Sequence, residues 1–228
     1  MIRNGTYGGC HPTFTDQPNL HDLPQLRRII RAKRRSLTAK QQLSNSSAAN
    51  KILTRSTLFR NSKNIAIYLE TDGEIAISQL LALIARNKKT AFLPVLRPMQ
   101  PNRLWFAKYS YGDKLIRNKY KIPEPDIRKH RPIPPYSLDL ILVPLVAFDS
   151  YCNRVGMGGG FYDRTFAYLK NRNRWIKPKL IGVAHELQQV TTIQTNRWDI
   201  PLDGVITESN FYMRDNFACK DQIIENNS

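Results

Sequence analysis

The sequence LILVPLVAFDSYCNRVGMGGGFYDRTFAY, residues 140–168, decides the fold class of this chain. It opens with an apolar run, crosses a polar turn, gathers Gly156, Gly158, Gly159 and Gly160, and then resumes with helical spacing. Glycine lacks a Cβ, so such a loop can lie close against a ligand, and a following helix presents unpaired N–H groups and a partial positive charge. The stretch therefore predicts a strand, a phosphate-binding loop and a helix.

Charged side chains flank this glycine loop. Arg154 precedes it, and Tyr162, Asp163 and Arg164 follow at the expected helix start. The carboxylate indicates magnesium, an oxygen-seeking ion that commonly accompanies nucleotide phosphates.

Two common glycine loops do not match the sequence. In the dinucleotide pattern G-x-G-x-x-G, starting at Gly156, Phe161 occupies the place of the third glycine. The P-loop pattern requires Lys and then Ser or Thr after its last glycine, whereas Phe161 and Tyr162 follow Gly160.

Short apolar strands alternate with helical patterns along the chain. We expect a helix over residues 38–59, with Thr38 as its N-cap. This alternation predicts a three-layer α/β/α, Rossmann-like fold with a mostly parallel open sheet, whose ligands collect beyond the carboxyl ends of the strands. The predicted strands are residues 65–69, 90–95, 104–107, 140–144, 180–184 and 204–207.

One domain is expected over residues 23–215. Residues 1–22 have little periodicity and are predicted to be a disordered N-terminal extension, and residues 216–228 a C-terminal tail. The proline-rich residues 123–135 predict a surface crossing within the domain.

Composition favours a cytoplasmic protein. Of the 228 residues 41% are hydrophobic, and no apolar run approaches the roughly 18 residues of a membrane span. We expect neither a secretory signal nor a membrane segment. The cysteines Cys10, Cys152 and Cys219 are widely spaced, which favours a reducing compartment over a disulfide scaffold.

Net charge supports a competing interpretation. Lys and Arg total 35 against 18 Asp and Glu, giving +17, a balance that would suit a nucleic-acid binder. Much of the charge lies in residues 27–35, where Leu26, Ile29 and Ile30 form an apolar stripe. We interpret this as a basic amphipathic helix with its arginines on a solvated face.

Four segments together resemble a known family. Residues 144–165, PLVAFDSYCNRVGMGGGFYDRT, resemble the signature of the 5-formyltetrahydrofolate cyclo-ligase (5,10-methenyltetrahydrofolate synthetase) family in its bacterial form. IAIYLETDGEIAISQLL (65–81), TAFLPVLRP (90–98) and WDIPLDGVITES (198–209) are similar to its acidic loop and helix, its second strand and its C-terminal motif.

The resemblance implies an enzyme that cyclises 5-formyltetrahydrofolate to 5,10-methenyltetrahydrofolate with ATP and Mg²⁺, through phosphorylation of the N5-formyl oxygen. It implies a monomer without specific nucleic-acid binding, acting on folate with or without a polyglutamate tail. The implied catalytic residues are Arg154, Tyr162 and Arg164, and the implied metal ligands Asp163 and Asp199. The implied ATP contacts are Leu26, Arg27, Arg154, Val155, Gly156, Met157, Gly158, Gly159, Gly160, Phe161 and Tyr162. The implied folate contacts are Arg27, Leu69, Glu74, Met157, Gly158, Gly159, Gly160 and Phe161.

The sequence departs from the family pattern near its N-terminus. Many relatives carry a lysine just before the pair that matches Leu26 and Arg27, whereas this chain has Leu23-Pro24-Gln25, so Arg28 or Arg31 is expected to replace it.

Several candidates have two interpretations. Glu74 is expected to open a helix, where the dipole favours a carboxylate with or without a role toward folate. Tyr68 and Trp105 fit a pterin pocket or the core, and His185 fits the site or a hydrogen-bonded structural role. Asp203 is expected to start the last strand. Besides the nucleic-acid binder, a folate-binding homologue without activity remains an alternative.

Overall fold

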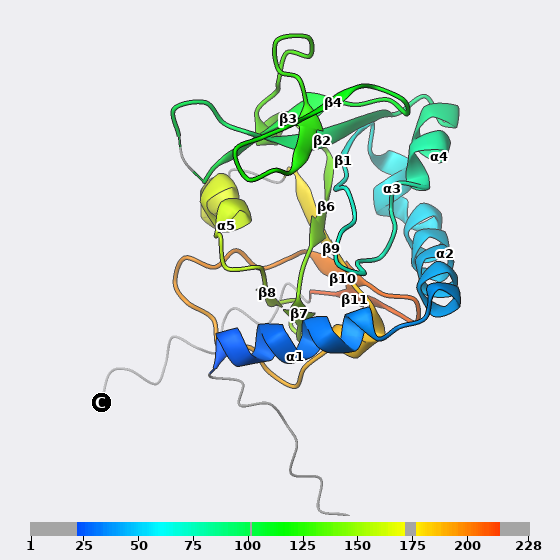
Figure 1. Ribbon diagram of the computed structural model, residues 1–228, viewed down its shortest axis with the longest axis vertical. Helices are drawn as coiled ribbons and strands as arrows, with labels where there is room; N and C mark the ends of the chain where they lie inside the picture. Colours follow the sequence, from blue (N-terminus) through cyan, green and yellow to red (C-terminus); the bar gives the residue numbers. More distant parts are fainter. Residues whose placement is uncertain (1–21, 101, 172–176, 215–228) are drawn as a thin grey trace, which may run out of the picture.

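A seven-stranded sheet forms the centre of the computed structural model, which describes residues 22–100, 102–171 and 177–214 (Figure 1). Its strand order is β11-β10-β9-β6-β1-β2-β3. The strands from β10 to β2 run parallel, and β11 and β3 pair antiparallel at the two edges. Their bounds are β1 (Asn64–Ala66), β2 (Thr90–Leu96), β3 (Leu104–Lys108), β6 (Leu140–Pro144), β9 (Lys179–Val183), β10 (Gly204–Ile206) and β11 (Phe211–Met213).

Helices cover both faces of this sheet, which confirms the three-layer prediction. One face buries Leu53, Phe59 and Ile84 from α2 (Ala39–Arg55), α3 (Thr57–Asn61) and α4 (Leu80–Arg86). The other buries Phe166 and Leu169 from α5 (Phe161–Phe166) and the 3₁₀ helix Ala167–Asn171. Figure 1 shows the two groups on opposite sides of the sheet. Because β6 is covered on both faces, its apolar run is continuous, as expected for a central parallel strand.

The helix predicted over residues 38–59 is instead two helices. Thr38 caps α2 as predicted, but Ser56 has extended backbone angles and accepts a hydrogen bond from the Phe59 amide at 3.1 Å. This side chain supplies the N-cap of a new helix, so α2 ends before Ser56 and α3 begins after it.

Five short elements were not predicted, because each is too short to show a period. They are β4 (Leu115–Arg117), β5 (Pro123–Pro125), β7 (Ala147–Phe148), β8 (Arg154–Val155) and the edge strand β11. The structure also has 3₁₀ turns at Pro135–Ser137 and Glu186–Gln188.

The prediction of a surface crossing over residues 123–135 is partly wrong. Glu124 and Asp126 are buried, and Glu124 Oε2 accepts hydrogen bonds from the Leu96 amide at 3.1 Å and from Asn118 at 2.9 Å. Polar side chains are tolerated inside when their hydrogen bonds are made, so composition alone was misleading here.

Helix α1 (Leu23–Arg35) lies across the end of the molecule beside β7 and β8 (Figure 1). Leu26 and Ile30 pack with Val146, Ala147 and Val155 in a separate apolar cluster. Asp22 caps the helix by accepting from the Gln25 amide at 3.0 Å. Apart from Asp22, the predicted extension over 1–22 and the tail over 216–228 lie outside the described residues.

None of the helices within the described residues is long and apolar enough to cross a membrane.

Candidate functional site

The glycine loop joins β8 to α5. A β7–β8 hairpin, which the sequence showed only as a polar turn, separates it from β6. Gly158 has φ +97° and Gly160, the residue before α5, has φ +61°. These are left-handed conformations that L-residues rarely adopt, so the glycines are required by the path of the chain.

Two arginines hold the carbonyls of this loop. Arg27 Nε donates to the Gly156 carbonyl at 2.8 Å, and Arg164 Nη2 donates to the Gly159 carbonyl. Within the described residues, the backbone amides of Met157, Gly158 and Gly159 donate no backbone hydrogen bond. The loop therefore offers donors to an anion while the carbonyls of Gly156 and Gly159 are occupied by the two arginines.

Helix α5 is shorter than the sequence indicated. It has six residues before the chain tightens into a 3₁₀ turn, so its macrodipole is weak. Positive charge at the loop comes mainly from the arginines around it.

Arg154 connects the glycine loop to the C-terminal motif. Its Nη2 donates to Asp163 Oδ1 at 2.7 Å, and its Nη1 donates to the Ile200 carbonyl. The Ile200 amide donates to the same Asp163 oxygen at 3.1 Å. Asp199 immediately precedes Ile200, so the structure brings the two predicted metal ligands into one region.

Asp163 and Asp199 suit a magnesium ion that is carried mainly by phosphates. Asp199 Oδ2 accepts from the Asn196 amide at 2.7 Å, and in the described part of the chain neither Asp163 Oδ2 nor Asp199 Oδ1 makes a hydrogen bond. The same part contains no group of three or more His, Cys, Asp or Glu placed to hold a metal. Because Mg²⁺ commonly uses one or two carboxylates and fills its shell with water and phosphate oxygens, this donor set fits it.

The acidic segment after β1 is a turn, and the prediction that Glu74 opens a helix is wrong. The Glu74 amide donates to the Thr71 carbonyl at 3.0 Å, and Glu74 Oε2 accepts from the Thr71 amide at 3.0 Å. These bonds close the turn locally, and α4 begins only at Leu80. Strand β1 ends at Ala66, earlier than predicted, as the chain leaves the sheet toward this turn.

Glu74 lies among buried groups that perturb one another. Burial raises the pKa of Glu74, while the Thr71 hydrogen bonds and the positive charge of Arg34 oppose that rise. Burial also raises the pKa of Tyr162, and the charge of Glu74 raises it further. The pKa of Tyr68 is raised by burial and by Glu74 as well, and its hydroxyl donates to the Ile75 carbonyl at 3.0 Å. The charge of Glu74 therefore acts on the pKa of Tyr162, at the start of α5, as well as on that of Tyr68.

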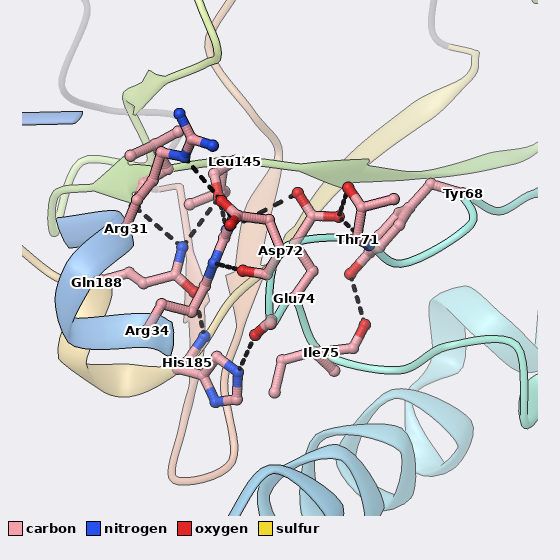
Figure 2. Close-up of polar contacts among 12 residues, drawn as sticks. Arg31, Arg34, Tyr68, Thr71, Asp72, Glu74, Ile75, Leu145, His185 and Gln188 are labelled. Atoms are coloured by element: carbon pink, nitrogen blue, oxygen red, sulfur yellow. Dashed lines mark hydrogen bonds and ion pairs between the residues drawn. The ribbon is translucent and has the colours of Figure 1, made fainter. Parts of the chain in front are cut away.

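Three arginines of α1 bind Asp72 of the acidic turn, so the interpretation of its arginines as a solvated face is partly wrong; Figure 2 shows Arg31 and Arg34 directed at this turn. Arg31 Nε donates to Asp72 Oδ2 at 2.7 Å, and Arg35 Nε donates to Asp72 Oδ1. Arg34 is only 1% exposed and donates to both the carbonyl and the carboxylate of Asp72. Arg31, proposed as a substitute for the family's lysine, is therefore paired with Asp72, whereas Arg28 is exposed.

His185 has the hydrogen-bonded structural role, the second of the two interpretations of this residue. It is fully buried, with Nε2 3.0 Å from the Gly73 carbonyl and Nδ1 3.1 Å from Asn45 Nδ2. A carbonyl can only accept, so Nε2 carries the proton and Nδ1 accepts from the amide. Burial lowers the pKa of His185, so it supports the acidic turn as a neutral ring.

Other predicted residues lie in different surroundings. Leu26 and Val155 are buried in the cluster beneath α1, and Leu69 packs partly against the core near Tyr68. Trp105 contacts Arg97 in a separate hollow of about 480 Å³, which none of the other predicted site residues lines. Asp203 directly precedes β10, as expected.

The flanks of the glycine loop differ in exposure. Phe161 meets Tyr120 edge-on with ring centroids 5.7 Å apart, so its ring has a packing contact. Met157 is exposed.

Two central residues were missed from the sequence, Asp72 and Arg34. Asp72 stood beside Gly73 in an evident turn, and Arg34 lies seven positions after Arg27, on the same helix face. That spacing was the available signal.

Comparisons with known proteins agree on one family. The model of the 5-formyltetrahydrofolate cyclo-ligase family matches residues 20–208. The 5-formyltetrahydrofolate cyclo-ligase of Escherichia coli K12 is 38% identical over 182 residues, covering 79% of this chain and 97% of that protein. The Haemophilus influenzae protein of the same name is 36% identical over 188 residues, covering 82% and 98%. The NMR structure of Aquifex aeolicus 5,10-methenyltetrahydrofolate synthetase aligns with a TM-score of 0.71 at 26% identity, covering 89% of this chain and 98% of that one.

Proposed function

Because the chain belongs to the 5-formyltetrahydrofolate cyclo-ligase family, we propose that it closes 5-formyltetrahydrofolate to 5,10-methenyltetrahydrofolate. The reaction consumes ATP and releases ADP and phosphate. One observation carries the proposal beyond family membership: helix α1 contacts both the glycine loop and the acidic turn. Its Arg27 donates to the Gly156 carbonyl at 2.8 Å, and its Arg34 Nη1 lies 3.7 Å from Glu74 Oε1. This shared helix supports a site in which the loop binds phosphate and Glu74 binds the pterin.

Glu74 is the proposed folate anchor. A pterin presents adjacent N–H donors, and a carboxylate can accept two of them side by side. The Thr71 hydrogen bonds and the nearby Arg34 favour the ionised carboxylate against the effect of burial. Leu69 and the loop residues Met157 to Phe161 would complete the folate site.

The glycine loop is the proposed nucleotide site. Its amides, with Arg27 and Arg164, would bind the phosphates, and Arg154 would stabilise the charge that develops on the transferred phosphoryl group. Asp163 and Asp199 would hold Mg²⁺, which when bound neutralises phosphate charge.

In the proposed mechanism the formyl oxygen on N5 attacks the γ-phosphorus, and the bond to ADP breaks. N10 then attacks the activated formyl carbon, the N10 proton is lost, and phosphate leaves with the original formyl oxygen. The protein's part is to hold the two substrates in line and to stabilise phosphoryl charge. Tyr162, whose raised pKa keeps the hydroxyl protonated, would orient the reacting groups as a hydrogen-bond donor.

Turnover tests this function directly. The purified chain, given 5-formyltetrahydrofolate, ATP and Mg²⁺, is expected to produce the methenyl chromophore together with one ADP per product. Omitting ATP or chelating Mg²⁺ should stop it. Folate binding measured by calorimetry without turnover would support the inactive homologue instead.

The setting of the enzyme forms part of the proposal. We expect a cytoplasmic monomer that accepts folate with a polyglutamate tail. Light scattering measures the assembly, and KM values for mono- and polyglutamyl substrates measure the tail preference.

A further inference from the structure

Asp72 is held in an uncommon backbone conformation by three guanidinium groups. It has φ +54° and is followed by Gly73 at φ +74°. A non-glycine residue in this region persists when its surroundings fix it. Arg31, Arg34 and Arg35 of α1 all donate to its carboxylate. Burial raises the pKa of Asp72, but the hydrogen bonds from Arg35, Arg31 and Arg34 outweigh that effect and hold it well below its usual range.

Arg34 links this turn to the sheet. Its Nε donates to the Asp72 carbonyl at 2.8 Å and its Nη2 to Asp72 Oδ2 at 2.9 Å. Its Nη1 lies 3.7 Å from Glu74 Oε1 and 3.4 Å from the Leu145 carbonyl, just beyond β6. A buried guanidinium is tolerated when its charge and its donors are matched in this way.

Glu74 is consequently held from two sides. Thr71 binds Oε2 within the turn, and Arg34 faces Oε1 from α1 (Figure 2). Arg34 is itself placed by Asp72, two residues before Glu74. The position and the charge of Glu74 therefore depend on Arg34 and Asp72. Neither of these two residues is among the proposed contacts to ATP or folate.

We propose that Arg34 and Asp72 are positioning residues that fix the Glu74 carboxylate for the pterin of the folate substrate. This inference rests on the proposed function of Glu74. The pair acts on folate rather than on ATP, because α1 keeps its own hold on the glycine loop through Arg27 and through the burial of Leu26 and Ile30.

Arg34 and Asp72 have opposite electrostatic effects on the Glu74 carboxylate. Arg34 lowers the pKa of Glu74, and Asp72 raises it. Tyr68 from the segment after β1, Tyr162 from α5 and His185 beyond β9 are other titratable groups of this region, and the shifts in their pKa values keep all three neutral near pH 7. The charged groups that act on these three residues besides Arg34 and Glu74 are Glu70, Arg154 and Glu208.

The test measures kcat and the KM values for folate and for ATP, with a pH profile of kcat/KM for folate, in Arg34→Gln, Arg34→Lys and Asp72→Asn. Arg35→Gln is the matched control, since it removes a charge and a contact with Asp72 on the same helix, while Arg35 makes no hydrogen bond or ion pair with Glu74 within the described residues. Circular dichroism and Tm establish that each variant is folded.

Both Arg34→Gln and Asp72→Asn are expected to raise the folate KM about tenfold, the loss of roughly one charge-assisted hydrogen bond, with the ATP KM changed less than twofold. The acidic limb of the pH profile should move to higher pH in Arg34→Gln and to lower pH in Asp72→Asn. Arg34→Lys keeps the charge but loses the fork geometry, so it should raise the folate KM without moving the limb. Arg35→Gln should change the folate KM no more than about twofold on the scale of an exposed ion pair.

Equal rises in both KM values with an unmoved limb would overturn the inference, because they would assign the pair to helix docking alone. An Arg35→Gln effect as large as that of Arg34→Gln would also overturn it. If Arg34→Gln does not fold, Arg34→Lys and Asp72→Asn decide the matter. Absence of turnover in the wild type would contradict the proposed function instead. In that case, calorimetric Kd values for 5-formyltetrahydrofolate in the same variants would still test whether Arg34 and Asp72 position Glu74.

Discussion

Arg154 and Asp163 form an ion pair of unequal burial. Their closest atoms are 2.7 Å apart, with 6% of the arginine side chain and 26% of the aspartate side chain exposed. Asp163 Oδ1 accepts from Arg154 and from the Ile200 amide, whereas Oδ2 makes no hydrogen bond within the described residues and remains available to a ligand. This division permits Asp163 to be structural and functional at once.

Asp163→Asn is expected to lower kcat at least about 100-fold and to lower Tm as well. The amide keeps the shape but loses a ligand charge, and it weakens a charge-assisted hydrogen bond of about 1.5–3 kcal/mol. Asp199→Asn is the matched comparison, because within the described residues the Asp199 side chain bonds only to Asn196 in its own turn, so it should lower kcat with a smaller change in Tm. Both are measured as kcat against Mg²⁺ concentration with thermal melts. If Asp163→Asn lowers Tm but not kcat, Asp163 is not a ligand of Mg²⁺.

Gly158→Ala is expected to raise the KM for ATP and to destabilise the fold. At φ +97° an L-residue is strained by about 1–2 kcal/mol, and the new methyl group would meet the Arg27 guanidinium at 3.7 Å. Gly112→Ala controls for strain, because Gly112 has φ +92° with nothing within 4 Å of the added carbon. Steady-state kinetics and denaturant titrations should show similar destabilisation in both variants and a KM change only in Gly158→Ala.

Arg27→Ala is expected to raise the KM for ATP about tenfold while leaving the fold intact. It removes the Nε hydrogen bond to the Gly156 carbonyl, an interaction of a charged donor worth about 1.5–3 kcal/mol. Lys33→Ala removes an equal charge from an exposed position of the same helix. Should the two variants have the same KM, general electrostatic attraction would explain the effect.

Stability is expected to fall as the pH drops below about 6.5, the ordinary pKa of histidine, with His185 as one cause. Because burial lowers the pKa of His185 in the folded protein, the unfolded chain takes up its proton first. The unfolded state then binds more protons, so the free energy of unfolding decreases with falling pH by up to about 1.4 kcal/mol per pH unit for one site. Urea titrations between pH 5 and 7 give the free energy of unfolding at each pH. This free energy should change less steeply with pH in His185→Asn than in the wild type. An unchanged slope would mean that other groups dominate.

The central strands of the sheet were predictable from the sequence because they are buried on both faces. The apolar run of residues 140–144 has no other reading at that length, and β6 matches it to the residue. The short elements were not predictable, since two or three residues such as β7 and β8 show no period. The break at Ser56 depends on a side-chain cap that competes with helix continuation.

The candidate site was predictable at its glycine loop and only partly elsewhere. The four glycines within residues 156–160 indicate an unusual backbone from the sequence alone. The arginine partners of Asp72, by contrast, lie at least 37 positions away along the chain. Amphipathic spacing assigned the arginines of α1 to solvent because it weighs only apolar side chains. Ion pairing across such separations is invisible to that pattern.

The left-handed backbone at Asp72 also bears on the order of folding. Local sequence supplies the turn only in part, and its stabilising guanidinium groups arrive from a helix that docks over a long loop of chain. The acidic turn should thus be late to acquire protection against amide hydrogen exchange, after α1 has settled on the β7–β8 hairpin.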